Sequence, residues 1–308
     1  MQYNSKIFVA GGQSGLVGTA IVRNLQSRGY KNIIIKKHQE FDLLNQNQVS
    51  SFFKKERPEY VFLAAALVGG IWANKTQKAD FIYDNLQIQN NVIYNAWKYK
   101  VKKLLFLGSS CIYPKHAKQP IKEEYFMTGL LEETNDAYAV AKIAGIKMCQ
   151  SFNEQYKTKF ISVMPTNLYG PNDNFNLQTS HVVPALIRKF HDAKINNEKE
   201  VVLWGTGKVY REFMYVDDAA DALVFLMKNY NNSEIINIGT GKDLTIRQLA
   251  TIIKTVINFK GKITWDKTKP NGTPRKLLDV SKLHKLGWRP KTSLEQGIKN
   301  EYKWFLKN

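Results

Sequence analysis

The first 165 residues alternate between two hydrophobic patterns. Short runs that are apolar almost throughout are typical of strands buried on both faces, and they occupy 6–10, 32–36, 60–66, 103–110 and 160–165. Between them, apolar residues recur at helical spacing over 15–29, 45–56, 79–100 and 137–156. Strands that alternate with helices indicate an α/β fold with a doubly wound parallel sheet, the Rossmann arrangement.

The pattern changes after about residue 168. A loop rich in Asn, Pro and Gly, "LYGPNDNFN", is followed by a helical pattern near 182–194, a short strand pattern at 200–205 and another helix at 216–228. We therefore expect a Rossmann domain over 1–168 and a smaller α/β domain over 169–308. A segment near 209–240 is expected to return to the first domain.

Composition excludes several classes of protein. With 44% hydrophobic and 23% charged residues, the chain is typical of a globular protein with a core. No apolar run is long enough to span a membrane, and the start "MQYNSKIFVAGG" has no signal-peptide pattern. Two cysteines make neither a disulfide framework nor a zinc cluster. We interpret the chain as a cytoplasmic protein without a metal site or a membrane partner.

The net charge is +19, from 45 Lys and Arg against 26 Asp and Glu. The lysines are scattered in pairs, without a dense basic run or a nucleic-acid-binding motif. A solvated lysine-rich surface explains this charge. Where the positive charge serves a ligand instead, a small anionic substrate fits it better than a nucleic-acid partner does.

A glycine-rich turn, "VAGGQSGLVG", joins the first expected strand to the first expected helix. Gly12, Gly15 and Gly18 have the spacing GxxGxxG. Glycines let the backbone turn tightly and approach a pyrophosphate, which the N–H groups of the helix start then bind. This placement predicts a dinucleotide site.

The end of the second expected strand bears on the choice of dinucleotide. An acidic residue there would hold the ribose 2′-hydroxyl of NAD, but this chain has Lys36, Lys37 and His38. Positive groups suit a 2′-phosphate and favour NADPH. The alternative is that they are solvated surface charges.

Tyr138 and Lys142 lie four residues apart in "AYAVAKIAG", on one face of an expected helix. A lysine beside a phenol is expected to lower the pKa of the phenol, which makes Tyr138 a proton donor or acceptor near neutral pH. Ser109, at the end of the fourth strand, is expected to hydrogen-bond a substrate oxygen. Together with the glycine-rich turn, these residues resemble the signature of extended short-chain dehydrogenases/reductases.

The resemblance extends to one family over nearly the whole chain, from about Lys6 to Phe305. The chain is similar to GDP-L-fucose synthases in the blocks "AALVGGIWAN", "ADFIYDNLQIQNNVI", "LGSSCIYPK", "KIAGIKMC", "MPTNLYGPNDNF", "SHVVPALIRKFHDAK", "WGTGKVYREFMYVDD" and "GTPRKLLDVSKLHKLGW". The resemblance implies a bifunctional enzyme that epimerises GDP-4-keto-6-deoxy-D-mannose at carbons 3 and 5 and then reduces carbon 4 with NADPH to give GDP-L-fucose.

The family match also implies roles for two titratable residues. Cys111 matches the base that removes protons beside the ketone, and His181 matches the acid on the other face. A thiol and an imidazole both titrate close enough to neutral pH for this work. A lone cysteine is otherwise a core residue, and we interpret the other cysteine, Cys149, as packing.

The expected binding residues extend beyond this catalytic set of Ser109, Cys111, Tyr138, Lys142 and His181. The cofactor positions are Gly12, Gly15, Leu16, Val17, Gly18, Lys36, Lys37, His38, Leu107, Gly108, Ser109, Ser110, Tyr138, Lys142, Pro165, Thr166, Asn167, Leu168 and His181. The substrate positions are Asn167, Lys189, Trp204, Arg211 and Asn271. Arg211 is able to bind a phosphate with two hydrogen bonds.

The chain departs from the family pattern at three places. The turn "AGGQSG" is one residue longer than usual, and Gln13 and Ser14 stand where an arginine is often found. Lys189 replaces a common arginine, which removes bidentate phosphate binding there. Asn271 replaces a frequent aspartate in "KPNGTPRK".

Three alternatives to GDP-L-fucose synthesis remain open. The same chemistry on a GDP-6-deoxy-4-keto-heptose needs only a slightly larger pocket. A 4-reductase without epimerase activity conflicts with the presence of Cys111 and His181. A non-catalytic dinucleotide-binding or basic scaffold conflicts with the complete catalytic set. The resemblance further implies a homodimer through the helices at 79–100 and 137–156.

Overall fold

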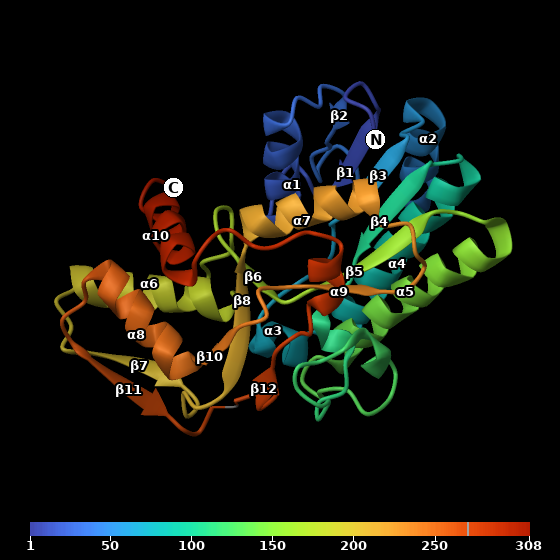
Figure 1. Cartoon of the computed structure of the whole chain (residues 1–308). Coiled ribbons are helices and arrows are strands. Elements are labelled where there is room, and N and C mark those ends of the chain that lie inside the picture. The colour runs from blue at the N-terminus through green and yellow to red at the C-terminus, as the bar shows by residue number, and fades with distance from the viewer. Residues whose placement is uncertain (270) are drawn as a thin grey trace.

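The computed structural model describes residues 1–269 and 271–308, and its first lobe is built on a six-stranded sheet. The strands lie in the order β2-β1-β3-β4-β5-β9, and every neighbouring pair is parallel. Their bounds are β1 Ile7–Ala10, β2 Ile33–Ile34, β3 Tyr60–Leu63, β4 Lys103–Leu107, β5 Phe160–Pro165 and β9 Ile236–Ile238. The predicted doubly wound parallel sheet is confirmed (Figure 1).

Helices cover both faces of this sheet, because successive strand side chains point to opposite sides. Ile7 and Val9 of β1 belong to one apolar cluster, whereas Phe8 and Ala10 belong to the other. The first cluster lies under α1 Leu16–Ser27 and α7 Val216–Asn229, and the second under α2 Gln46–Glu56, α4 Lys78–Lys98 and α5 Asp136–Tyr156. The chain reverses its direction across the sheet between β1 and β3, the position where open α/β sheets bind ligands.

The second lobe has smaller sheets and its own apolar core (Figure 1). Strand β8 Tyr210–Tyr215 pairs with β10 Asp243–Thr245, β12 Arg275–Lys276 and β6 Asn167–Tyr169, and β7 Glu200–Trp204 pairs with β11 Lys262–Asp266. Its helices are α6 Val182–Ile195, α8 Ile246–Ile257 and α10 Leu294–Phe305. The short elements of the chain are α3 Ile71–Thr76, η1 Ser110–Ile112, η2 Glu123–Tyr125 and α9 Ser281–Lys285.

The chain crosses between the lobes more often than the hydrophobic pattern indicates. Helix α7 and strand β9 belong to the first lobe. A further return, not expected from the sequence, brings Leu283 of α9 and Trp288 into the first apolar cluster. The Trp288 indole Nε1 donates to Asp221 Oδ2 of α7 at 2.8 Å. This second return depends on tertiary contacts that no local pattern encodes.

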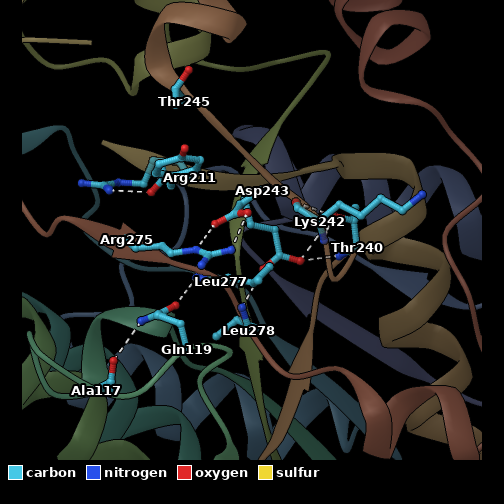
Figure 2. Close-up of polar contacts among 12 residues, drawn as sticks. Ala117, Gln119, Arg211, Thr240, Lys242, Asp243, Thr245, Arg275, Leu277 and Leu278 are labelled. Carbon is cyan, nitrogen blue, oxygen red and sulfur yellow. Dashed lines mark hydrogen bonds and ion pairs between the residues drawn. The ribbon is translucent and has the colours of Figure 1, made fainter. Parts of the chain in front are cut away.

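Glu212 of β8 ties the two lobes together, although none of its surface is exposed. Its carboxylate accepts hydrogen bonds from the backbone N–H groups of Thr240 at 2.5 Å, Gly241 at 2.7 Å and Leu278 at 2.9 Å. These donors come from the loop after β9 and the segment after β12 (Figure 2). A buried carboxylate is tolerated when several N–H groups satisfy it. We call Glu212 and these donors the joint.

The second strand is shorter than expected, with two residues instead of five. It lies at the edge of the sheet, and Ile35 directly after it is 36% exposed. An edge position gives the strand only one neighbour, so pairing ends early. No helix in the described residues is both long enough and apolar enough to cross a bilayer.

A buried carboxylate in the second lobe gives the fold a pH dependence. Glu301 of α10 is completely buried, and among the described residues neither of its carboxylate oxygens has a hydrogen-bond partner. Burial, with the negative charge of Asp173 nearby, raises the pKa of Glu301 well above its usual range. The folded state therefore keeps a proton that the unfolded state loses above its ordinary pKa.

We expect Glu301→Gln to be more stable than the native chain at pH 7–8 and to differ little near pH 4.5. As the pH rises from the unfolded to the folded pKa of Glu301, the free energy of unfolding of the native chain falls by up to about 1.4 kcal/mol for each pH unit. The amide of Glu301→Gln does not titrate, so this fall is absent in the variant. Urea unfolding at both pH values measures the difference. The matched control is Glu295→Gln, at an exposed site on the same helix. Parallel stability curves for the native chain and Glu301→Gln would contradict a raised pKa.

Candidate active site

The glycine-rich turn lies at the carboxyl end of β1, where the chain reverses direction across the sheet. A Cβ at Gly18 would lie 1.9 Å from the backbone oxygen of Gly11, so only glycine lets α1 pack this closely on the turn. Gly15 has φ +86° and faces open space, and α1 starts without a side-chain cap or an acidic residue in its first turn. An uncapped helix N-terminus beside open space fits a pyrophosphate. Gly11, with φ +85°, was not singled out from the sequence.

The three candidate 2′-phosphate ligands, Lys36, Lys37 and His38, follow β2 and are exposed. No carboxylate within the described chain forms an ion pair with Lys36 or Lys37. Their charges are thus available to an anionic group. Gln13 and Ser14 of the turn are exposed as well and carry no charge.

The structure brings the candidates for proton transfer together beyond the carboxyl end of β4. Lys142 is 4% exposed, and its Nζ donates to the Leu107 backbone oxygen at 2.9 Å. The same Nζ lies 5.6 Å from the centre of the Tyr138 ring. Ser109 precedes η1, and its hydroxyl accepts from the Cys111 backbone N–H at 3.2 Å.

The pKa of Tyr138 moves in the opposite direction from the expected one. Burial raises the pKa of the phenol, Cys111 adds to this rise, and a hydrogen bond with Ser109 lowers it only in part. The expectation that Lys142 lowers the pKa of the Tyr138 phenol is wrong for the protein without bound ligands. Burial also lowers the pKa of Lys142 to about 7, so the ammonium brings less positive charge to the pair. The phenol is therefore a proton donor rather than a phenolate.

Cys111 is half-buried on η1, and two donors contact its sulfur. Asn135 Nδ2 lies 3.2 Å from Sγ, and Lys276 Nζ lies 3.5 Å away. Asn135 stands at the N-cap of α5 but does not cap it, because its side chain turns to the sulfur instead. Cys149 is buried in the core, where burial raises the pKa of its thiol to about 12. The two cysteines thus differ as expected.

His181 lies at the start of α6, open to solvent on one side and crowded by protein on the other. That crowding lowers the pKa of its imidazole, and the positive charge of Lys276 lowers it further. Lys276 therefore acts on both Cys111 and His181. Neither Lys276 nor Asn135 was singled out from the sequence, although each lies in or next to a block that resembles the family.

Four of the substrate candidates, Lys189, Trp204, Arg211 and Asn271, lie in the second lobe. Lys189 Nζ lies 5.5 Å from the centre of the Trp204 ring, which is 45% exposed, and Lys269 lies 5.6 Å from the same ring. Arg211 Nη2 donates to the Asn271 backbone oxygen at 3.3 Å. Burial lowers the pKa of Arg211 to about 10, against a rise from Cys111 and Glu132. Arg211 thus lies between the nucleotide candidates and Cys111.

Two of these candidates are already engaged within the protein. Asn271 Oδ1 accepts from the Thr206 backbone N–H at 2.9 Å, so its side chain fixes the turn after β7. Asn167 Nδ2 donates to the backbone oxygen of Glu212 at 2.8 Å, and Thr166 Oγ1 donates to the same oxygen at 3.1 Å. The joint therefore also positions the candidate cofactor segment 165–168.

Comparison with known proteins agrees with this geometry. A model described as "NAD dependent epimerase/dehydratase family" matches residues 7–239. GDP-L-fucose synthase 1 of Arabidopsis thaliana is 60% identical over 305 residues, which cover 99% of this chain and 94% of that protein. The chain belongs to the NAD dependent epimerase/dehydratase family and, within it, to the group of GDP-L-fucose synthases. The resemblance inferred from the sequence is confirmed.

Solved structures show the same relationship. A Campylobacter jejuni GDP-6-OMe-4-keto-L-xylo-heptose reductase is 44% identical, with a TM-score of 0.95 over 100% of this chain and 99% of that one. A GDP-L-fucose synthetase of Naegleria fowleri bound to NADP is 33% identical, with a TM-score of 0.92 over 100% and 96%. The family and this neighbour support a dinucleotide of the NADP type.

We expect Lys276→Met to raise the pKa of His181, because the substitution removes the positive charge that disfavours the imidazolium. The measurement is an NMR titration of the histidine ring protons, with His181→Gln used to assign the signal. Arg275→Met is the matched control, since the Arg275 guanidinium is already paired with Asp243 (Figure 2). An unchanged His181 titration in Lys276→Met would show that this lysine does not act on the imidazole.

Proposed function

We propose that the protein converts GDP-4-keto-6-deoxy-D-mannose into GDP-L-fucose, by epimerisation at carbons 3 and 5 followed by NADPH-dependent reduction at carbon 4. The observation that carries the proposal is the convergence of Cys111, His181 and Tyr138 on one cleft, joined by Lys276 and Arg211. Homologues named GDP-L-fucose synthase support this choice of substrate.

The residues suit the first half of this reaction. Cys111 removes a proton from a carbon beside the ketone, and the electron pair moves onto the ketone oxygen as an enolate. Ser109 and Tyr138 donate hydrogen bonds to that oxygen. His181 returns a proton to the opposite face of the carbon, which inverts it. Asn135 and Lys276 hold the sulfur toward the substrate throughout.

The second half of the reaction, the reduction, takes place at the same ketone oxygen and its carbon 4. NADPH, when bound, supplies the hydride that reduces carbon 4. Tyr138 donates its phenolic proton to the carbonyl oxygen as the alcohol forms, which agrees with its raised pKa. Gly12 and Gly15 would hold the pyrophosphate at the start of α1, Gly18 would let α1 pack against that turn, and Lys36, Lys37 and His38 would bind the 2′-phosphate.

In this proposal, the second lobe binds the nucleotide part of the GDP-sugar substrate. Arg211 and Lys189 bind the diphosphate, and Trp204 packs against the guanosine. The Lys189 ammonium is a point charge and does not form two parallel hydrogen bonds with a phosphate, so Arg211 provides the bidentate contact.

We infer a homodimer formed through α4 and α5. The exposed face of these packed helices carries Tyr83, Tyr94 and Val140, which are 65%, 41% and 44% exposed. An exposed apolar patch of this kind is typical of an association surface.

The deciding experiment uses GDP-4-keto-6-deoxy-D-mannose in heavy water, with mass spectrometry and NMR of the sugar. We expect deuterium at carbons 3 and 5 without NADPH, and GDP-L-fucose once NADPH is added. Cys111→Ala is expected to lose deuterium exchange by at least about 100-fold, because the base is gone. Tyr138→Phe is expected to lose reduction to a similar degree.

Cys149→Ala is the matched control, because this cysteine is buried away from the cleft. Reduction without deuterium uptake by the native enzyme would instead identify a simple 4-reductase. Full turnover by Tyr138→Phe would refute the role of the phenol.

A GDP-6-deoxy-4-keto-heptose is the second candidate substrate, favoured by the TM-score of 0.95 to the heptose reductase. We expect kcat/KM for the hexose to exceed that for the heptose by about tenfold or more, since one extra carbon costs about 1–3 kcal/mol in a fitted pocket. Side-by-side turnover of the two GDP-sugars measures the ratio. A higher kcat/KM for the heptose would reverse the assignment.

A further inference from the structure

A second cavity, with a volume of about 760 Å³, lies at the amino ends of the parallel strands of the main sheet. The active site lies at the carboxyl ends of the same strands. The cavity is lined by Tyr60 and Lys103, the first residues of β3 and β4, and by Lys159, which directly precedes β5. Ser109 and Thr166 follow the other ends of β4 and β5. With a rise of ~3.3 Å per residue, the two sites are roughly 20 Å apart. The proposed function makes no use of this cavity.

Lysine dominates the cavity wall. Seven of its fifteen lining residues are lysines, whereas Lys and Arg together make up 45 of the 308 residues of the chain. The seven are Lys98, Lys100, Lys102, Lys103, Lys157, Lys159 and Lys228. We call them the lysine cluster. Among the residues that the structure describes, the one carboxylate paired with the cluster is Glu59, which binds Lys102.

Helix dipoles explain only part of the lysine cluster. Lys98 and Lys228 lie in the last turns of α4 and α7, where a cation is favourable. Lys157 is the C-cap residue of α5, and its Nζ donates to the Glu154 backbone oxygen of that helix at 2.9 Å. The other four lie in loops or at the start of a strand. Among the described residues, Lys100, Lys159 and Lys228 form no ion pair.

Lys103 places a positive charge in the floor of the cavity. It is 4% exposed, and its Nζ donates to the backbone oxygens of Leu226 and Tyr230 and to Asn231 Oδ1 rather than to a carboxylate. Burial and the charge of Lys159 lower the pKa of Lys103 to about 8. Burial and three lysines of the cluster likewise lower the pKa of the Met1 amino group. These groups repel one another, and an anion in the cavity would relieve the repulsion.

Aromatic side chains complete the wall. The rings of Trp97 and Tyr156 lie 4.5 Å apart, and Tyr156 is 44% exposed. Tyr60 lines the cavity as well. Exposed rings beside lysines offer stacking for a base and positive charge for phosphates. The volume lies within the range of small-molecule sites.

We propose that this cavity is a second ligand site, which binds a nucleoside polyphosphate with the phosphates on the lysine cluster and the base against Tyr156. A second copy of the chain is a poor occupant, because the same positive surface would repel it. The site is independent of the proposed function, since none of its residues belongs to the active site.

The test is isothermal titration of the protein with ATP, without added NADP or GDP, because either nucleotide would compete for a site of this chemistry; the lysine variants below separate the site from the active site. We expect one ATP per chain, with affinity that falls as salt is raised. Lys157→Gln/Lys159→Gln is expected to weaken ATP about tenfold, because two charged contacts are lost. The matched control, Lys260→Gln/Lys262→Gln, removes the same charge from the second lobe and is expected to leave affinity unchanged.

A further ligand, tripolyphosphate, and a further variant, Tyr156→Ala, separate the contribution of charge from that of stacking. Tripolyphosphate is expected to bind about tenfold more weakly than ATP, and Tyr156→Ala is expected to remove that difference. Equal affinity for both ligands in the native chain would overturn the nucleotide assignment. ATP binding that survives in Lys157→Gln/Lys159→Gln, or is lost equally in the control pair, would overturn the site itself. Turnover of the GDP-sugar is expected to stay unchanged in every variant, so failure here leaves the proposed function untouched.

Discussion

The arrangement of the active site depends on one buried carboxylate, Glu212. Its two side-chain oxygens accept N–H groups from Thr240, Gly241 and Leu278, and its backbone oxygen accepts from Thr166 and Asn167. Burial raises the pKa of Glu212, whereas these donors lower it. A buried acid with satisfied oxygens resists movement, because displacing any donor leaves a desolvated charge unpaired. The two lobes are thereby held in one relative position.

That position determines the chemistry in the cleft. Arg211 precedes Glu212 on β8, and Lys276 lies in β12, which pairs with β8. Fixing β8 therefore fixes both cations relative to Cys111 on the first lobe. In the proposed reaction the second lobe thus contributes charge to proton transfer as well as contacts to the nucleotide. The proposed reaction, in which Cys111 removes a proton and His181 returns one to the opposite face, requires this register between the lobes.

The fold was readable from the sequence where local patterns carry the information. Strands buried on both faces appear as apolar runs, and the glycine turn and the Tyr138–Lys142 spacing are local. The bounds of α5 and β5 agree with the expected ones within one residue. The second strand was overestimated, because an edge position is a property of the sheet. The return of Leu283 and Trp288 to the first core likewise depends on contacts distant in the sequence.

The sequence by itself determined the doubly wound sheet, the dinucleotide turn and the Tyr138–Lys142 pair, because periodicity and motif spacing encode each of them. The resemblance to the family added Cys111 and His181 as candidates. Only the tertiary structure decided their electrostatics. Asn135 and Lys276 reach Cys111 across 24 and 165 residues of chain. Burial overrides the neighbouring lysine and raises the pKa of Tyr138. The lysines of the cluster are spread over 98–103, 157–159 and 228, and they line one cavity because the amino ends of the parallel strands and the helix ends that precede them lie on the same side of the sheet.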